Sequence, residues 1–515
     1  MVVPRILFPA TPPSPPRSLG SLLSDRAQAA PDRPSLTFEG RTWTRSELDS
    51  RANRRARAFA ALGVGQDDLV MMVLSNGPEF HETVFAIWKL GATPVPVSYR
   101  LADGELFAIA ATAQPKLIVG DDRELTPGAL HLPAGYEPDP ALSDAPLPER
   151  TASCWKISTS GGSTGRPKLI VDHAPGTVDP DTPSIGLELD DVVLMPAPLY
   201  HNGPFTQSNW ALAWGAHVVE MARFDALGWL KLVEQHGVRW AYLVPTMMHR
   251  IINLPEDVRA KYDVSSIEIA VHMAAPCPAW LKQRWIDWLG PDRIWEVYGG
   301  TEAVGGTANN GRDWLQYPGT VGQALGGGEI RILGESGETL PPGEIGQVFF
   351  VPPPGREAAG YHYLGVEPAP PGTQESHGES YGDMGHVNEE GFLFLADRRT
   401  DLILSGGVNI YPAEVEAAIE LFPTVASSVV IGLPNVDMGQ RTHAIIEVAP
   451  GHPEPEPGEL ETFLAKHLAR YKLPYSCEFV SEPLRDDAGK VRRGVIRDER
   501  IARAEAGERF ARLRG

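Results

Sequence analysis

The chain has 515 residues, which is too long for one ordinary domain and predicts two to four structural units. Its 66 acidic residues against 46 basic ones give a net charge of −20, so neither nucleic acid nor an anionic membrane is expected as a partner. Three widely separated cysteines, Cys154, Cys277 and Cys477, have neither disulfide-framework nor metal-ligand spacing, and they predict a reducing, cytoplasmic location.

The first 20 residues are interrupted by prolines and lack an unbroken apolar stretch, which predicts a loose arm rather than a signal peptide. No run approaches 18 apolar residues, so no membrane span is expected. Strand-like and helix-like stretches then alternate up to about residue 330. Strands are predicted at 67–75, 93–98, 116–120, 191–198, 216–221, 240–246 and 267–275, with a helix over 79–92. This pattern indicates parallel strands buried on both faces.

The pattern changes from about residue 320. Residues 326–350 predict short strands joined by Gly/Pro turns, and residues 352–380, rich in Pro, Gly and Glu, predict a long surface loop. Residues 397–423 predict a strand, a glycine turn and a helix, which open a compact α+β unit of about 110 residues. We therefore expect an α/β protein with a large body of parallel and mixed sheets plus a β subdomain (1–399). A small mobile C-terminal domain (400–515) follows, with the boundary near Arg399–Thr400.

The segment STSGGSTGRPK, residues 158–168, has the composition of a phosphate-binding loop. It follows a strand-like run at 155–158, and glycine-freed backbone N–H groups with Ser/Thr hydroxyls can surround a polyphosphate. Lys168 adds a point charge. The P-loop spacing is not met, and a flexible Gly/Ser loop is the structural alternative.

The order of residues in 158–168 resembles the corresponding loop of the adenylate-forming superfamily, which includes acyl-CoA synthetases, firefly luciferase and the adenylation domains of peptide synthetases. Six further segments are similar to that family and occur in its order: APLYHNGPF (197–205), AAPCP (274–278), YGGTEAVGG (298–306), 381–403, SGGVNIYPAEVE (405–416) and DDAGKVRR (486–493). The branch that looks most similar contains bile-acid-type CoA ligases and amide bond synthetases. Gly161 departs from the pattern, since many members have a second hydroxyl there, and Thr400 replaces the usual hinge Lys or Asp.

The resemblance implies an ATP-dependent carboxylic acid ligase. Attack of the carboxylate on the α-phosphorus of ATP gives an acyl-AMP, and charge develops on the phosphates, where positive groups must be positioned. Lys490 is implied as the movable catalytic cation, His201 as a catalytic or gating residue of the acyl pocket, and Glu302 as a Mg²⁺ ligand. Nucleotide binding is implied for Ser158, Thr159, Ser160, Gly161, Gly162, Ser163, Thr164, Lys168, Ala275, Tyr298, Gly299, Gly300, Thr301, Asp383 and Arg398.

Each of these roles has a structural alternative when the residues are considered alone. Lys490 is then an exposed loop lysine, and Thr301 with Glu302 is a helix N-cap followed by a first-turn acid. Asp383 and Arg398 form a surface ion pair of little energetic value. His201 is a turn histidine bonded to backbone.

The acid and the acceptor are less closely defined. Amino-acid-activating relatives carry a Phe-Asp pair where this chain has His201-Asn202, so a substrate ammonium would lack its counter-charge and an acid without an α-amino group is expected. The candidates for an apolar pocket or core are Phe205, Trp210, Trp214, Met247 and Met248. CoA is the favoured acceptor, with Arg492 and Arg493 as weak candidates for its phosphates. Transfer to a free amine is the alternative. A further possibility is a non-catalytic module that binds an acyl nucleotide, but the presence of both Glu302 and Lys490 argues against it. A luciferase-like oxidase is also possible, but nothing in the sequence favours it.

Overall fold

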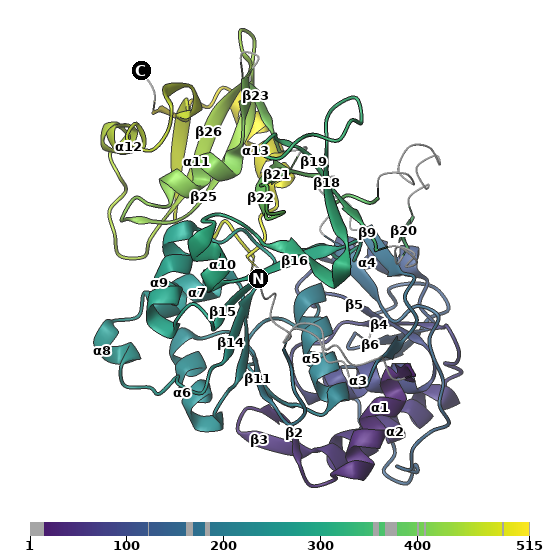
Figure 1. Ribbon diagram of the computed structural model, residues 1–515. Coiled ribbons are helices and arrows are strands. Elements are labelled where there is room, and N and C mark those ends of the chain that lie inside the picture. The colour runs from purple at the N-terminus through teal and green to yellow at the C-terminus, as the bar shows by residue number, and fades with distance from the viewer. Residues whose placement is uncertain are drawn as a thin grey trace.

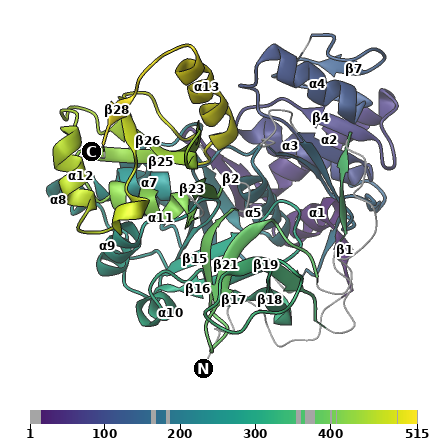
Figure 2. The same ribbon diagram turned by 90° about the horizontal axis from the view of Figure 1, so that it is seen from above.

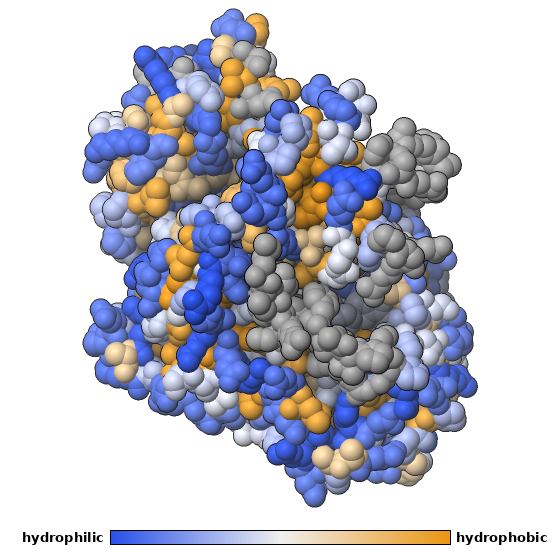
Figure 3. Space-filling view, in the orientation of Figure 1, coloured by the Kyte–Doolittle hydropathy of each residue, from blue (hydrophilic) through white to orange (hydrophobic). Residues whose placement is uncertain are grey.

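The computed structural model describes residues 15–121, 123–160, 168–180, 186–353, 360–365, 378–398, 401–405, 408–486 and 489–513. Figure 1 shows a large body with a smaller C-terminal unit above it. The face seen in Figure 3 is mostly hydrophilic, which agrees with the large number of charged residues. Within the described residues, no helix has the length and apolar character needed to cross a bilayer.

The body is organised around a nine-stranded sheet in the order β17-β16-β15-β14-β13-β11-β12-β2-β3. The strands are β17 (Gln323–Ala324), β16 (Gly306–Asn310), β15 (Ile294–Gly299), β14 (Ile269–His272), β13 (Trp240–Leu243), β11 (Val192–Met195), β12 (His217–Glu220), β2 (Pro34–Phe38) and β3 (Arg41–Thr44). The six strands from β15 to β2 are mutually parallel, as the apolar runs predicted. The outer pairs are antiparallel.

A second sheet, β5-β4-β6-β7, is entirely parallel. Its strands are β4 (Leu69–Met72), β5 (Thr93–Pro96), β6 (Leu117–Val119) and β7 (Leu130–Leu132). The helix α3 (Pro78–Lys89) contacts this sheet and also α1 and α2, and all of its residues from Phe80 to Lys89 are buried. A helix that is buried on every side must lie inside a layer, and α3 accordingly belongs to the large core of the body.

The remaining helices of the body connect its strands or cover the sheets. They are α1 (Leu19–Ala29), α2 (Arg45–Ala61), α4 (Asp103–Ala113), α5 (Asn202–Trp214), α6 (Ala226–His236), α7 (Pro245–Ile252), α8 (Glu256–Arg259), α9 (Ala279–Leu289) and α10 (Gly311–Gln316). In Figure 1, α5 lies near the centre of the body, and α6, α7 and α9 lie together at one side of the large sheet.

The predicted N-terminal arm is shorter than expected. The strand β1 (Arg17–Ser18) pairs with β10 (Thr177–Val178), and α1 begins at Leu19. The Ser18 hydroxyl accepts a hydrogen bond from the Ser21 N–H at 3.2 Å, so it caps the helix. The arm prediction was therefore wrong for its last four residues, because a helix start and buried leucines follow the prolines directly. Residues 1–14 lie outside the described chain.

The predicted surface loop at 352–380 contains a strand. Residues of β20 (Tyr361–Leu364) pair antiparallel with β9 (Lys168–Asp172), which pairs with β8 (Ile157–Ser160). The loop prediction was wrong at these four residues. Their Tyr-His-Tyr-Leu sequence favours a strand, but it is short and surrounded by turn-forming residues, and its partner lies about 190 positions earlier in the chain.

The small β unit predicted for 326–350 is observed and extends further. It is an antiparallel sheet of β18 (Glu329–Leu333), β19 (Gly346–Val351), β21 (Asp383–Val387) and β22 (Leu393–Arg398), preceded by a short 3₁₀ turn, η1 (Leu325–Gly327). Figure 1 shows this sheet beside the C-terminal unit, above the end of the large sheet.

The C-terminal unit has its own sheet and its own core. Its elements are β23 (Ile403–Ser405), β24 (Val408–Ile410), α11 (Pro412–Ile419), β25 (Val425–Asn435), β26 (Gly439–Val448), α12 (Pro457–Leu464), η2 (Arg470–Lys472), β27 (Ser476–Val480), α13 (Arg493–Glu505) and β28 (Ala511–Arg512). The predicted strand, glycine turn and helix correspond to the β23–β24 hairpin and α11. Because Arg399–Thr400 lies outside the described residues, the division into domains at that point stays a prediction.

A buried ion pair joins the helices of the C-terminal unit. Arg493, the first residue of α13, pairs with Glu416 of α11 and donates to the Val430 carbonyl at 2.6 Å. Its Nε lies 3.2 Å from Asp401 Oδ2. These partners hold the Arg493 guanidinium inside the unit and argue against its contact with CoA phosphates, which stays a prediction for both arginines. Arg492 instead reaches the body: its Nη1 lies 3.3 Å from Glu105 Oε1 of α4, and Figure 2 shows α13 on the side toward α4.

Arg493→Met should destabilise the C-terminal unit by about 3 kcal/mol, because it leaves the Glu416 carboxylate buried without its cation. Urea denaturation of the full chain followed by tyrosine fluorescence and far-ultraviolet dichroism measures the change. Arg497→Met on the same helix is the control, since the Arg497–Asp498 pair is exposed and its loss should cost less than about 1 kcal/mol. Equal effects of the two substitutions would contradict the role given to the buried pair.

Candidate functional site

The candidate site is built on the carboxyl ends of the central parallel strands. The chain leaves β11 into 197–205, β13 into 244–248, β14 into 273–278 and β15 into 299–302. Since the carboxyl ends of parallel strands meet at one edge, segments up to about a hundred residues apart converge there. In open α/β sheets this edge is the usual place for ligands. His201, Ala275, Thr301 and Glu302 all lie in these segments.

Two alanines at this edge have the left-handed backbone conformation that favours glycine. Ala274 has φ +75° and Ala303 has φ +54°. Such a backbone conformation at a non-glycine residue raises the free energy of the folded state by about 1 kcal/mol or more. It persists only where the surrounding structure imposes it. The two positions flank the predicted adenine and metal positions, Ala275 and Glu302. No helix begins at Thr301, where a turn leads into β16, so the helix-cap alternative for Thr301 and Glu302 is wrong.

Tyrosine side chains link the end of β15 to the small β unit. The Tyr298 hydroxyl donates to Asp383 Oδ2 at 2.5 Å, and the Tyr381 hydroxyl donates to the Gly305 carbonyl at 2.7 Å. The Tyr381 ring covers Gly300, where a Cβ would lie 2.2 Å from Tyr381 Cε1. Glycine at position 300 is therefore required by the close approach of this ring.

The predicted ribose pair lies on neighbouring strands. Asp383, at the start of β21, is opposite Arg398 at the end of β22, and only 8% of Asp383 is exposed. A surface ion pair is therefore excluded for Asp383. The Arg398 side chain lies outside the described part of the structure, so its contact with ribose or phosphate stays a prediction.

The Glu302 carboxylate is held by a residue that sequence reasoning missed. The Tyr363 hydroxyl, on β20, donates to Glu302 Oε1 at 2.8 Å, and the Lys168 ammonium lies 5.0 Å from the centre of the Tyr363 ring. Burial and the neighbouring carboxylate raise the pKa of Tyr363, so the hydroxyl remains protonated and donates. Tyr363 thus connects the predicted metal ligand with the predicted phosphate-loop lysine.

The residues present fit a Mg²⁺ ion that arrives with a polyphosphate. Tyr363 engages Glu302 Oε1 and leaves Oε2 available for a cation. Across the described ranges, no three His, Cys, Asp or Glu side chains gather into a metal site. A cation held here would therefore complete its coordination with phosphate oxygens and water, which is how Mg²⁺ is usually bound.

The glycine-rich loop joins two antiparallel strands. Ser158 is opposite Ile170 and Ser160 is opposite Lys168 in the β8–β9 pair. The segment between them is thus the connection of a hairpin whose outer neighbour is β20. Ser158 is buried, and Thr159 lies on the same strand. The predicted phosphate ligands Gly161, Gly162, Ser163 and Thr164 fall outside the described residues, as does the Ser160 side chain.

The Lys490 loop lies against the body at the edge where Ala275 is predicted to meet the adenine. A Cβ added to Gly489 would lie 3.6 Å from both Ala275 Cβ and Thr246 Oγ1. Gly489 has φ +74°, its N–H donates to the Asp486 carbonyl at 2.8 Å, and the Lys490 N–H donates to Asp486 Oδ1 at 2.8 Å. This tight turn presents Lys490, which is exposed, beside the segment that follows β14.

Arg485 holds this turn on the C-terminal unit. It donates to the Gly489 carbonyl at 3.4 Å and to Ser427 Oγ of β25 at 3.0 Å. Its Nη2 lies 3.6 Å from Glu420 Oε1. Burial raises the pKa of Glu420 to about 7, against the lowering effect of Arg485. Sequence reasoning missed both residues, because an Arg and a Glu 65 positions apart give no local signal.

The acyl-pocket residues divide into two groups. His201 precedes the first residue of α5, its side chain does not cap that helix, and its ring lies 4.6 Å from the Tyr200 ring. Trp210 is partly exposed. The others, Phe205, Trp214, Met247 and Met248, are buried in the large core, so the core interpretation holds for them.

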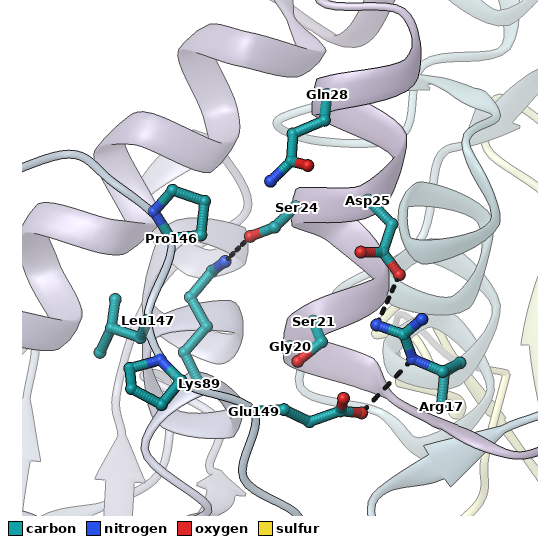
Figure 4. A pocket seen from close by; sticks show the side chains of 11 residues that line it. Arg17, Gly20, Ser21, Ser24, Asp25, Gln28, Lys89, Pro146, Leu147 and Glu149 are labelled. Atoms are coloured by element: carbon teal, nitrogen blue, oxygen red, sulfur yellow. Dashed lines mark hydrogen bonds and ion pairs between the residues drawn. The ribbon is translucent and has the colours of Figure 1, made fainter.

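A small hollow beside α1 is separate from this site. Figure 4 shows Lys89 donating to Ser24 at 2.6 Å and Arg17 paired with Asp25 and Glu149. None of the predicted site residues lines it. Lys89 also donates to Asp49 at 2.7 Å, so it joins α1, α2 and α3.

Comparison with known proteins identifies the family. A model of the AMP-binding enzyme family matches residues 23–354, and a model of the AMP-binding enzyme C-terminal domain matches residues 414–490. The chain belongs to this family. It is 31% identical to the fatty acid–acyl-carrier-protein ligase ScoC of Streptomyces coeruleorubidus, over 94% of this chain and 96% of the relative. It is 32% identical to a feruloyl-CoA synthase of Amycolatopsis, over 93% of this chain and 99% of the relative. The predicted superfamily and its enzyme class, an ATP-dependent, AMP-forming acid ligase, are thereby confirmed.

Solved structures confirm the predicted fold of this family member. The o-succinylbenzoate CoA synthetase of Bacillus subtilis, in complex with its acyl-adenylate intermediate, has a TM-score of 0.79 at 24% identity, covering 94% of this chain and 99% of the other. The anthranilate CoA ligase AuaEII, in complex with anthranoyl-AMP, has a TM-score of 0.81 at 22% identity, covering 96% and 98%.

Tyr363→Phe should raise the Mg²⁺ concentration needed for half-maximal activity by roughly 10-fold, because removing one hydrogen bond to a charged group frees Glu302 to move. The measurement is a Mg²⁺ titration of acid-dependent pyrophosphate exchange at saturating ATP. Tyr317→Phe, which removes a hydroxyl that accepts from Gln316, is the matched control. An unchanged Mg²⁺ titration in Tyr363→Phe would contradict the positioning role.

Proposed function

We propose that this enzyme activates a carboxylic acid without an α-amino group as its acyl-AMP and then transfers the acyl group to the thiol of CoA. The observation that carries the proposal is the contact of the Gly489–Lys490 turn with Ala275 and Thr246. It puts an exposed lysine of the C-terminal unit beside the edge where the body would bind the nucleotide. The curated relatives named above, a CoA synthase and a carrier-protein ligase, support thiol chemistry.

The proposed roles follow the direction in which charge moves. A carboxylate attacks the α-phosphorus, and pyrophosphate leaves with the negative charge that develops on the phosphate oxygens. The 158–168 loop with Lys168 would hold the outgoing phosphates, and Lys490 would neutralise charge at the reacting phosphorus. Asp383 would accept hydrogen bonds from the ribose hydroxyls. Glu302, held by Tyr363, would bind the Mg²⁺ that accompanies ATP.

The proposed acid lies near the start of α5, with its carboxylate toward the phosphate loop. Gly203 in the first turn packs closely on two side chains, since a Cβ would lie 2.7 Å from the Tyr242 hydroxyl and 3.4 Å from Met273 Sδ, so a larger residue at position 203 would have to displace them. His201 would form the adjoining wall. Among the described residues of the first turn of α5, none is an acid that could accept a substrate ammonium.

Lys490→Ala should lower acyl-AMP formation by at least roughly 100-fold, because a positioned cation opposite developing phosphate charge is lost. ATP binding and acyl transfer from preformed acyl-AMP should be largely retained. Pyrophosphate exchange, nucleotide titration and single-turnover transfer measure the three properties.

Lys466→Ala is the matched control, since Lys466 is an exposed lysine of the same unit. If Lys490→Ala and Lys466→Ala exchange pyrophosphate equally fast, Lys490 is an ordinary surface lysine and its catalytic assignment fails.

The acceptor is tested by competition. Mass spectrometry of products formed from ATP, a panel of alkyl and aryl acids, and CoA beside an excess of a small amine should find acyl-CoA at low CoA. Amide formed in preference to thioester, with a yield that rises with pH as the amine loses its proton, would instead establish amide synthesis.

A further inference from the structure

One face of α5 is lined by partly exposed residues. Asn202, Thr206 and Trp210 are spaced by four, which places them on one side of a helix, and all three are partly exposed while 204–205 and 207–209 are buried. In Figure 1, α5 lies near the centre of the body. The face is therefore only partly covered by its neighbours, although the helix lies deep in the body.

The strand segment 155–158 packs on this face. The Lys156 ammonium contacts the Asn202 side-chain oxygen, one end of the face. The Trp155 ring stacks on Trp210, the other end, with centroids 5.3 Å apart and planes at 27°. Thr206 lies midway between these contacts.

Buried hydrogen-bonding groups on these two segments lack partners. Lys156 is 3% exposed, and an ammonium has three donors, but within the described structure only Asn202 accepts from it. The Trp155 ring, 4.3 Å from the nitrogen, is no lone-pair acceptor. The Asp172 carboxylate acts on the ammonium through its charge, and within the described residues it accepts a hydrogen bond from the Trp155 indole instead. Among the residues that the structure describes, no hydrogen-bond partner is found for the buried atoms Ser158 Oγ, Thr206 Oγ1 and Trp210 Nε1. Native proteins rarely leave such groups unpaired unless a ligand or water completes them.

The charge of this cluster indicates what would complete it. Burial lowers the pKa of Lys156 to about 8, so at neutral pH the group is still mainly an ammonium. The Trp210 indole can only donate, and the two hydroxyls can donate or accept. A buried cation beside hydrogen-bond donors favours an oxygen acceptor and disfavours an amine. The exposed part of the Trp210 ring adds an apolar wall.

We propose that Lys156, Thr206 and Trp210 form a specificity subsite of the acyl pocket, and that the acid it takes is an aryl acid with an additional oxygen acceptor on the ring. The inference rests on the proposed function, because it assumes that the acid enters beside the start of α5. Lys156 is then a specificity-determining residue for the distal oxygen, separate from the groups that act on the carboxylate.

The test compares matched acids with and without the ring oxygen. Pyrophosphate exchange is measured for benzoic and cinnamic acid and for their 2-, 3- and 4-hydroxy and methoxy derivatives. The wild-type enzyme should use the best oxygenated acid at least roughly 10-fold more efficiently, as kcat/KM, than its unsubstituted parent. Lys156→Met should abolish this preference while leaving kcat/KM for the parent acid within about 3-fold. Thr206→Val, which keeps the side-chain shape, should also reduce the ratio of kcat/KM for the oxygenated acid to kcat/KM for the parent acid.

Lys231→Met, an exposed lysine on α6, is the control, and thermal unfolding verifies that each variant is folded. If Lys156→Met lowers kcat/KM equally for oxygenated acids and for their parent acids, the proposed subsite is wrong. Lys156 would then act on the reacting carboxylate or stabilise the fold. A wild-type enzyme without preference for oxygenated acids would overturn it as well, and would leave the proposed function intact. If no acid of any class supports exchange although ATP binds, the proposed function itself fails.

Discussion

The candidate site depends on the shared direction of β11, β13, β14 and β15. Because these strands are parallel, every connection that leaves their carboxyl ends emerges at the same edge. The segments predicted to form the acyl pocket and to bind adenine and the metal are consequently neighbours although the sequence separates them widely. The packing that keeps the strands in register, including the fully buried α3 layer, thus also determines the geometry of the chemistry.

The second requirement is that the C-terminal unit brings its lysine to that edge. Arg485 joins the Lys490 turn to β25, Arg493 joins α13 to α11, and Arg492 reaches Glu105 of α4. One arginine thus holds the turn, the second joins two helices within the unit, and the third contacts the body. The exposed Arg492–Glu105 pair is the weakest of these, since such pairs contribute under about 1 kcal/mol. A change in the position of the unit would therefore cost little there.

Much of this arrangement could be predicted from sequence, and the failures have a common physical cause. The parallel strands were found because both faces are buried, which gives continuous apolar runs such as 240–243. Asp383, Glu302 and Lys490 could be proposed as site residues because they lie in contiguous motifs, and their roles stay predictions. Tyr363 and Arg485 were missed because their partners are distant in the chain, and a short strand such as β20 is stabilised by that distant pairing rather than by its own composition.

The strand β20 also has a consequence for attempts to shorten the protein. By composition, residues 352–380 invite deletion as a dispensable surface insertion. Removing 361–364 would take away the outer neighbour of β9 and leave Lys168 and Glu302 without the tyrosine between them. A minimal version of this enzyme must therefore keep these four residues, and also Glu379, whose backbone pairs with Phe350 of β19.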